Sequence, residues 1–197
     1  MSSTQPDAQA PVYPSEAHER SVVRWYVMRA YKKERQAEEA LSGPEGLEHF
    51  IPKRYTLRTY HGRKQRALVP AIPSMVFVHA SRDAIQAFKE HFPTLQYIVW
   101  KKGEHIEFLS VPERQMRSFI RVARQTEEDI LYFQPDEIHL KCGTHVRVHG
   151  GIFDGVEGIL VKVKGKRRRR VVIQIDEVAA IAAAEIEPDL IEILPDE

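Results

Sequence analysis

The fold of the last third of the chain depends on the stretch Gly150-Gly151-Ile152-Phe153-Asp154-Gly155-Val156-Glu157-Gly158. This stretch separates residues 144–149 from residues 159–164, and both segments alternate apolar and polar side chains as half-buried strands do. Glycines at both ends of a short polar loop predict a hairpin. Three of them are expected to take the positive φ angles of a tight, bulged turn: Gly151, Gly155 and Gly158.

The residues around this hairpin predict a small β-barrel. Phe153 is expected to lie exposed at the loop tip, and a second turn at 164–166 leads into a third strand at 170–175. Short strands at this spacing are typical of a barrel. The alanine-rich segment 178–184 favours a helix by propensity, but the barrel needs a strand there, and a strand is predicted.

Composition limits the classes of protein to consider. A chain of 197 residues with 43% hydrophobic residues fits one large domain or two small ones. No apolar run approaches the roughly 20 residues that a membrane helix needs. The first 20 residues lack the basic-then-apolar pattern of a secretion signal, and Cys142 is the single cysteine. We therefore expect a cytoplasmic protein without disulfides.

The net charge of +1 conceals two strongly basic segments. Neither segment contains an acidic residue, whereas every charged residue after position 170 is acidic. Clustered lysine and arginine indicate contact with a polyanion, although solvated hairpin tips are the competing interpretation. The basic residues are Lys53, Arg54, Arg58, Arg63, Lys64 and Arg66 in the first segment, and Lys162, Lys164, Lys166 and Arg167 to Arg170 in the second.

The order of predicted elements indicates an α+β domain followed by an all-β domain. Residues 1–20 are predicted to be a disordered tail, 21–125 the first domain, 126–137 an acidic linker and 138–197 the second domain. The first domain should open on a buried strand at 22–28. It should also contain a hairpin over 55–69 and helices at 30–41, 83–91 and 113–125, where Pro112 stands at a helix start.

Motifs in both halves resemble the NusG family of transcription elongation factors. The C-terminal pattern V-R-V-x-G-G-x-F-x-G-x-x-G, at 146–158, is similar to the KOW motif of that family. In the N-terminal half, Trp25-Tyr26-Val27, Phe50-Ile51-Pro52 and the segment 70–78 stand where the family has its conserved strand and docking motifs. The resemblance covers about 22–194. It implies an NGN-type antiparallel sheet with flanking helices, linked to a small SH3-like β-barrel.

The resemblance also implies partners. The family's docking motif forms an apolar patch that binds the clamp helices of RNA polymerase, and the matching residues here are Tyr31, Ile72, Pro73 and Met75. The barrel loop of the family recruits the termination factor Rho or a small-subunit ribosomal protein, which assigns this role to Ile152 and Phe153. The protein is expected to act as a monomer without cofactors.

Basic residues near these motifs are expected to bind nucleic acid. The non-template DNA strand is the expected partner of Arg29, Lys32, Lys33 and Arg35, with stacking from Tyr31. The hairpin residues Arg63, Lys64 and Arg66 are expected to contact upstream DNA or polymerase. Nascent RNA is a further candidate partner, and a nucleic-acid contact is one interpretation of Arg167, Arg168 and Arg169; a solvated turn is the other.

The chain departs from the family pattern at Ile72, Ser74, Met75 and Ile152. Together with the ending at 178–194, these departures resemble the specialised UpxY-type paralogues, which are operon-specific antiterminators for surface-polysaccharide genes. We therefore expect a factor that suppresses pausing or termination. The housekeeping factor and an RNA-binding or ribosome-associated KOW module are the alternatives.

Two kinds of chemistry are set aside. His139, Cys142, His145 and His149 suggest a zinc site, but His145 and His149 would lie about 13 Å apart along one strand. That separation is too large for one metal, whose Zn–N distances are about 2.0–2.1 Å. The sequence contains no nucleophile elbow and no phosphate-binding loop, so an enzyme is not expected.

Overall fold

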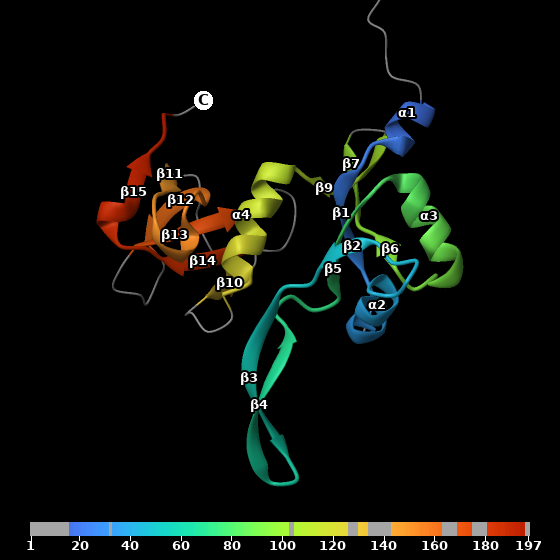
Figure 1. Ribbon diagram of the computed structural model, residues 1–197, viewed down its shortest axis with the longest axis horizontal. Helices are drawn as coiled ribbons and strands as arrows, with labels where there is room; N and C mark the ends of the chain where they lie inside the picture. The colour runs from blue at the N-terminus through green and yellow to red at the C-terminus, as the bar shows by residue number, and fades with distance from the viewer. Residues whose placement is uncertain are drawn as a thin grey trace, which may run out of the picture.

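The computed structural model describes residues 16–31, 33–102, 105–125, 130–133, 143–162, 169–174 and 181–195. It shows a sheet with helices on both faces, a long projecting hairpin and a separate all-β domain (Figure 1). The α+β class predicted from the sequence is confirmed. Within the described residues, no helix is long and apolar enough to cross a membrane.

A five-stranded antiparallel sheet forms the centre of the N-terminal domain. Its strands follow the order β2-β5-β1-β6, and β9 also pairs with β1. The strands are β1 (Arg24–Arg29), β2 (Glu48–Phe50), β5 (Met75–Ala80), β6 (Gln96–Tyr97) and β9 (Ser110–Val111). The β1 and β5 strands are apolar at nearly every position because helices cover both of their faces.

Two separate apolar cores lie on the two faces of this sheet. Tyr26 and Val76 pack into a core with α2 (Glu34–Leu41) and α3 (Arg82–His91). Val27 and Phe77 point to the opposite face and pack into a core that includes α4 (Glu113–Ala123). Successive side chains of a strand alternate between faces, so one strand contributes to both cores.

The N-terminal segment differs from the prediction. Residues 1–15 lie outside the described residues, but α1 (Glu16–Ser21) is a helix that contacts α3. The tail predicted over 1–20 therefore extends too far. The ion pair between Arg20 and Asp83, at 3.5 Å, is one reason that this short helix lies against α3.

Two hairpins complete the N-terminal domain. β3 (Lys53–Tyr60) and β4 (Arg63–Pro70) pair only with each other and project from the body of the domain (Figure 1). β7 (Val99–Lys102) and β8 (His105–Phe108) form the second two-stranded sheet.

The C-terminal domain is a six-stranded antiparallel sheet in the order β10-β14-β13-β12-β11-β15. Two 3-10 turns, η3 (Gly151–Phe153) and η4 (Pro188–Leu190), connect its strands. The strands are β10 (Leu131–Phe133), β11 (Thr144–Val148), β12 (Glu157–Lys162), β13 (Arg169–Gln174), β14 (Ile181–Glu185) and β15 (Ile191–Ile193).

Two features of this sheet bear on the sequence predictions. The alanine-rich segment contains a strand, β14, as the barrel required; residues 178–180 lie outside the described part. The segment predicted as a linker, 126–137, instead supplies β10, which pairs with β14 from Leu131↔Ala183 to Phe133↔Ile181. Cross-strand pairing therefore makes residues 131–133 part of the C-terminal sheet.

Helix α4 lies between the two domains (Figure 1). Phe119 contacts the N-terminal sheet, with ring centroids 5.5 Å from Phe77 and 6.2 Å from Phe50. Ser118, one position away on the helix, accepts a hydrogen bond from the backbone N–H of Glu157 in β12, at 3.4 Å. One apolar core thus contains residues of both domains and of the helix between them.

Candidate nucleic-acid and partner interfaces

The β3–β4 hairpin has the tight turn that its sequence requires. Tyr60 pairs with Arg63, which leaves His61 and Gly62 as a two-residue loop. Both loop residues have positive φ, 47° and 75°, as a type I′ turn demands. This turn matches the right-handed twist of the strands, so the ribbon continues undistorted to its tip.

The two faces of the hairpin carry different side chains. One face presents Tyr55, Leu57 and Leu68, which are 38%, 70% and 46% exposed. On this face the Arg66 guanidinium lies 3.7 Å from the centroid of the Tyr55 ring. The other face is polar and basic, and all of these members are exposed: Arg54, Arg58, Tyr60, Arg63 and Gln65. A ribbon of this kind offers cations to phosphates and an apolar surface to a protein.

A second exposed cluster lies at one corner of the central sheet. The Arg29 guanidinium donates to the Tyr31 hydroxyl at 3.2 Å, and Tyr31 is 60% exposed. The backbone N–H of Ala30 donates to the Ser74 carbonyl at 2.8 Å, and the Ser74 N–H donates to Glu34 Oε1 at 2.6 Å. These bonds hold the loop containing Pro73, also exposed, beside the loop containing Tyr31.

The remaining residues predicted for the polymerase and DNA contacts have different positions. Ile72 and Met75 are 5% and 4% exposed and belong to the core beneath the sheet. Only Tyr31 and Pro73 of the predicted polymerase set are therefore exposed. Lys33 and Arg35 are exposed, and Arg35 pairs with Glu39 at 3.1 Å; Lys32 lies outside the described residues.

The glycine-rich loop of the C-terminal domain differs from its prediction in two respects. Phe153 was expected at an exposed tip, but it is 7% exposed and packs into the core shared with α4, whereas Ile152 is 51% exposed. Gly151 and Gly155 do have positive φ, but Gly158 lies in β12 without it. A Cβ at Gly158 would lie 2.5 Å from the Val172 carbonyl oxygen, so glycine is required there by the close approach of β13.

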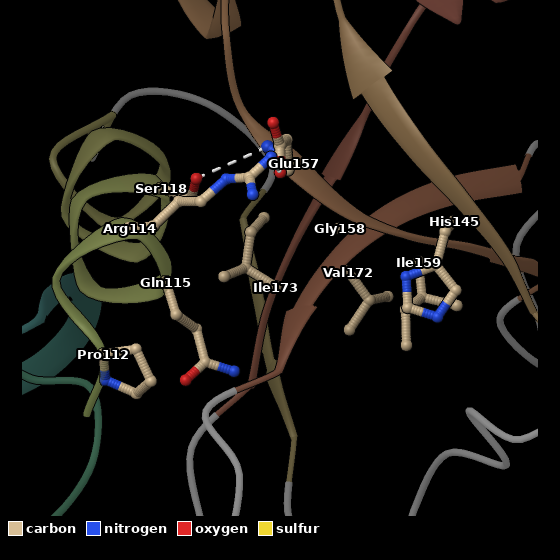
Figure 2. Close-up of a pocket in the computed structure, with 10 residues that line it drawn as sticks. All are labelled: Pro112, Arg114, Gln115, Ser118, His145, Glu157, Gly158, Ile159, Val172 and Ile173. Carbon is tan, nitrogen blue, oxygen red and sulfur yellow. Dashed lines mark hydrogen bonds and ion pairs between the residues drawn. The ribbon is translucent and has the colours of Figure 1, made fainter. Parts of the chain in front are cut away.

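A cleft of about 310 Å³ separates α4 from the C-terminal sheet (Figure 2). Pro112, Arg114 and Gln115 line the helix side, while His145 and Ile159 line the sheet side. No catalytic constellation occupies the cleft, since its polar groups are committed to the contact between the domains.

Glu157 is the centre of that contact. Its carboxylate accepts from Arg114 of α4 at 2.5 Å and from Arg147 of β11 at 2.9 Å. Burial raises the pKa of this carboxyl, but the hydrogen bonds from the two guanidinium groups outweigh burial and hold the pKa below its ordinary value. Charge-assisted bonds of this kind connect the helix of one domain to a strand of the other.

The network continues along the exposed side of the C-terminal sheet. Glu192 lies 2.6 Å from His149 Nε2 and 3.4 Å from Arg147 Nη1. The hydrogen bond from His149, together with the nearby positive charges, holds the pKa of the Glu192 carboxyl below its ordinary value. His149 therefore has a carboxylate partner. The structure shows no group of three or more metal-ligating side chains within its described residues, while His139 and Cys142 lie outside them.

The second basic segment lies mostly outside the described residues. Arg167 and Arg168 belong to the undescribed part, and Arg169 begins β13. The next residue, Arg170, is 1% exposed and lies 3.4 Å from Glu185, so it does not belong to an exposed basic patch.

Sequence inspection missed a row of exposed arginines on α4. These are Arg114, Arg117, Arg121 and Arg124, at intervals of three, four and three residues. That spacing places side chains on one face of a helix and would have identified the row once the helix was predicted. It was missed because each arginine is separated from the next by apolar or neutral residues, so no basic run appears in the sequence.

Comparison with known proteins gives two findings. Residues 23–120 match the family model described as NusG, transcription termination factor nusG. A solved structure described as "Domain interaction in Thermotoga maritima NusG" is 19% identical, with 88% of this chain and 98% of that chain covered and a TM-score of 0.45. No curated protein matches the chain.

Proposed function

We propose, because residues 23–120 of this chain belong to the NusG family, that the protein is a transcription factor that binds RNA polymerase through its N-terminal domain and suppresses pausing or termination. The family consists of transcription factors rather than enzymes, in agreement with the sequence prediction. The observation that carries the proposal is the family match over the domain that presents Tyr31 and Pro73 together at an exposed corner.

This corner is suited to docking on a protein. Tyr31 and Pro73 are apolar surface on adjacent loops, and burial of a large apolar side chain contributes about 1.5–3 kcal/mol. Arg29 fixes the Tyr31 ring through its hydroxyl, which reduces the side-chain entropy lost on binding. Ile72 and Met75 support the corner from inside, because their side chains pack beneath the loop that carries Pro73.

Nucleic-acid contacts extend from the same domain. The polar face of the β3–β4 hairpin is proposed to meet upstream DNA, and its apolar face to meet polymerase. Arg29, Lys33 and Arg35 surround Tyr31 and are proposed to contact phosphates of the non-template strand, with the Tyr31 ring as a stacking surface.

The finer assignment is an operon-specific antiterminator of the UpxY type. It is supported by the residues that depart from the family's docking motif, Ile72, Ser74 and Met75. Ser74 has a φ of 63°, so a serine adopts the left-handed conformation that the glycine of the family motif takes at no cost. For Rho or a ribosomal protein, the exposed Ile152 is a better contact than the buried Phe153.

The decisive experiment compares binding of core RNA polymerase by three proteins. They are the wild type, a Tyr31→Ser/Pro73→Ser variant, and an Ile106→Ser control, which removes an apolar side chain that is 68% exposed elsewhere on the domain. We expect the double variant to bind at least about tenfold more weakly, since 1.4 kcal/mol corresponds to a factor of ten, and the control to bind normally.

Two results would count against this function. Equal binding by all three proteins would remove the docking site from this corner, and no binding by any of them would remove polymerase as the partner. In vitro transcription through a terminator then tests antitermination. A gene deletion that proves lethal would favour the housekeeping factor over a specialised one.

A further inference from the structure

We propose that the arginine row of α4 and the glycine-rich loop of the C-terminal domain together form a groove that binds single-stranded nucleic acid. The arginine row consists of Arg114, Arg117, Arg121 and Arg124. This groove is separate from the Tyr31 corner and from the hairpin, and it needs residues of both domains. Its test uses nucleic acid without polymerase, so its failure is distinct from failure of the proposed function.

The arginine row has the geometry of a phosphate-binding strip. A helix rises 1.5 Å and turns 100° per residue, so the four residues span about 15 Å and lie within an arc of about 80°. Arg124 keeps helical backbone angles, φ −75° and ψ −16°, and therefore continues the row past the end of α4. Steps of about 4.5 and 6 Å along the axis suit a ligand that repeats its negative charge.

Two of the four cations are uncommitted within the protein. Arg114 pairs with Glu157 at 2.5 Å, and Arg117 with Glu113 at 3.3 Å. Within the part of the chain that the structure describes, no carboxylate lies within ion-pair distance of Arg121 or Arg124. Interaction with the helix dipole explains a cation in the last turn, where Arg121 stands, but not a row that extends over three turns.

The glycine-rich loop supplies the opposite wall. Gly155 and Arg121 line the same cleft, of about 540 Å³. A Cβ placed on Gly155 would lie 3.7 Å from Arg121 Nη1, so the backbone of one domain closely approaches the guanidinium of the other. An adjoining cleft of about 650 Å³ is lined by Arg117, Arg121 and Arg124 on the helix and by Gly151 and Ile152 on the loop.

The chemistry favours nucleic acid over an acidic peptide. Guanidinium groups bind phosphate oxygens through two parallel hydrogen bonds, and a single strand presents phosphates at regular intervals. Ile152, 51% exposed at the rim, offers an apolar surface to a base. Glycines without side chains allow the strand to approach the loop backbone closely.

The experiment measures binding of the full-length protein to labelled single-stranded RNA and DNA of roughly 12 nucleotides by fluorescence anisotropy over a range of salt concentrations. The first variant is Arg121→Gln/Arg124→Gln. Because each phosphate contact on a single strand contributes about 0.7 to the slope of log affinity against log salt, the slope should fall by about 1.4. A polyglutamate competitor should displace the strand poorly.

A matched pair at Gly155 tests whether both domains form the groove. Gly155 has a φ of 73°, which aspartate and asparagine tolerate alike, so Gly155→Asp and Gly155→Asn differ in charge but not in shape. Aspartate would lie beside Arg121 and compete with phosphate. We expect Gly155→Asp to bind about fivefold more weakly than Gly155→Asn, with the two melting at the same temperature.

Three results would overturn the proposal. An unchanged salt slope in the arginine variant would remove the row as a binding site. Equal binding by the two Gly155 variants would show that the C-terminal loop takes no part. Displacement by polyglutamate as efficient as by unlabelled nucleic acid would identify an acidic protein as the partner instead.

Discussion

Two loops of this protein carry similar sequence signals but have opposite surroundings. The His61–Gly62 turn and the glycine-rich loop at 150–155 both connect antiparallel strands through residues with positive φ. A Cβ on Gly62 would meet no atom within 4 Å, whereas Phe153 in the other loop is buried beside α4. A turn signal therefore predicts the backbone of a loop, and the rest of the fold decides whether that loop is exposed.

This difference separates the two loops by role. The β3–β4 hairpin contributes little to the core, so its side chains are available to partners. The glycine-rich loop joins the two domains, so most substitutions there should reduce stability before they affect binding. The predictions below test that separation, in order of decreasing effect on stability.

The largest effect is expected from Phe153→Ala. Removing a buried phenylalanine ring costs about 3–5 kcal/mol of unfolding free energy, because transfer energy is lost and a cavity remains. Tyr60→Ala on the hairpin is the control, since Tyr60 is 64% exposed and should change stability by no more than about 0.5 kcal/mol. Urea denaturation followed by circular dichroism measures both. Equal costs would contradict the burial of Phe153 against α4.

A pair of glycine substitutions compares a packing requirement with a conformational one. In Gly158→Ala the new methyl would lie 2.5 Å from the Val172 carbonyl oxygen, and overpacking against backbone should cost about 1–3 kcal/mol or more. In Gly62→Ala only the positive φ is unfavourable, at about 1–2 kcal/mol. Gly62→Asn should recover most of that loss, whereas Gly158→Asn should be worse than Gly158→Ala. Thermal unfolding distinguishes the four variants, and rescue by asparagine at both positions would contradict this distinction.

Local patterns predicted the elements, and long-range contacts explain the differences. Helices α2, α3 and α4 and strands β1 and β5 follow from periodicity within each segment. The burial of Phe153 could not be predicted in this way, because it depends on a helix that ends 30 positions earlier in the chain. The same holds for residues 131–133, whose pairing with β14 crosses about 50 positions of sequence.

The candidate sites divide along the same line. Arg63, Lys64 and Arg66 were predicted from a basic run, and the structure places them on an exposed hairpin. Ile72 and Met75 were chosen because a family motif carries a docking patch there, but here smaller aliphatic side chains stand in place of aromatic ones and are buried in the core. Motif position alone does not distinguish a residue that forms a surface from one that supports it.

A smaller effect is expected from the ion pairs at Glu157. The folded-state pKa of this carboxyl lies below its ordinary 4.5, so its ion pairs stabilise the protein above that pH and lose their contribution as pH falls through the folded-state pKa. Glu157→Gln should cost about 0.5–1 kcal/mol at pH 7, the range of partly exposed pairs. The difference from wild type should shrink as pH falls from about 5 to about 3. Unfolding measured across this range tests it, and a constant difference would assign the cost to packing instead.

The smallest effect on stability is expected at the hairpin, from Arg63→Gln/Lys64→Gln. Both residues are exposed and neither has an ion-pair partner among the described residues, so unfolding free energy should change by less than about 0.5 kcal/mol. If the ribbon binds a single strand through phosphates, the salt slope of that binding should nevertheless fall by about 1.4. Measuring both quantities on one variant decides whether the exposed loop is a functional surface. Loss of stability without a change in slope would place the hairpin with the docked loop, as part of the structure rather than as a site for partners.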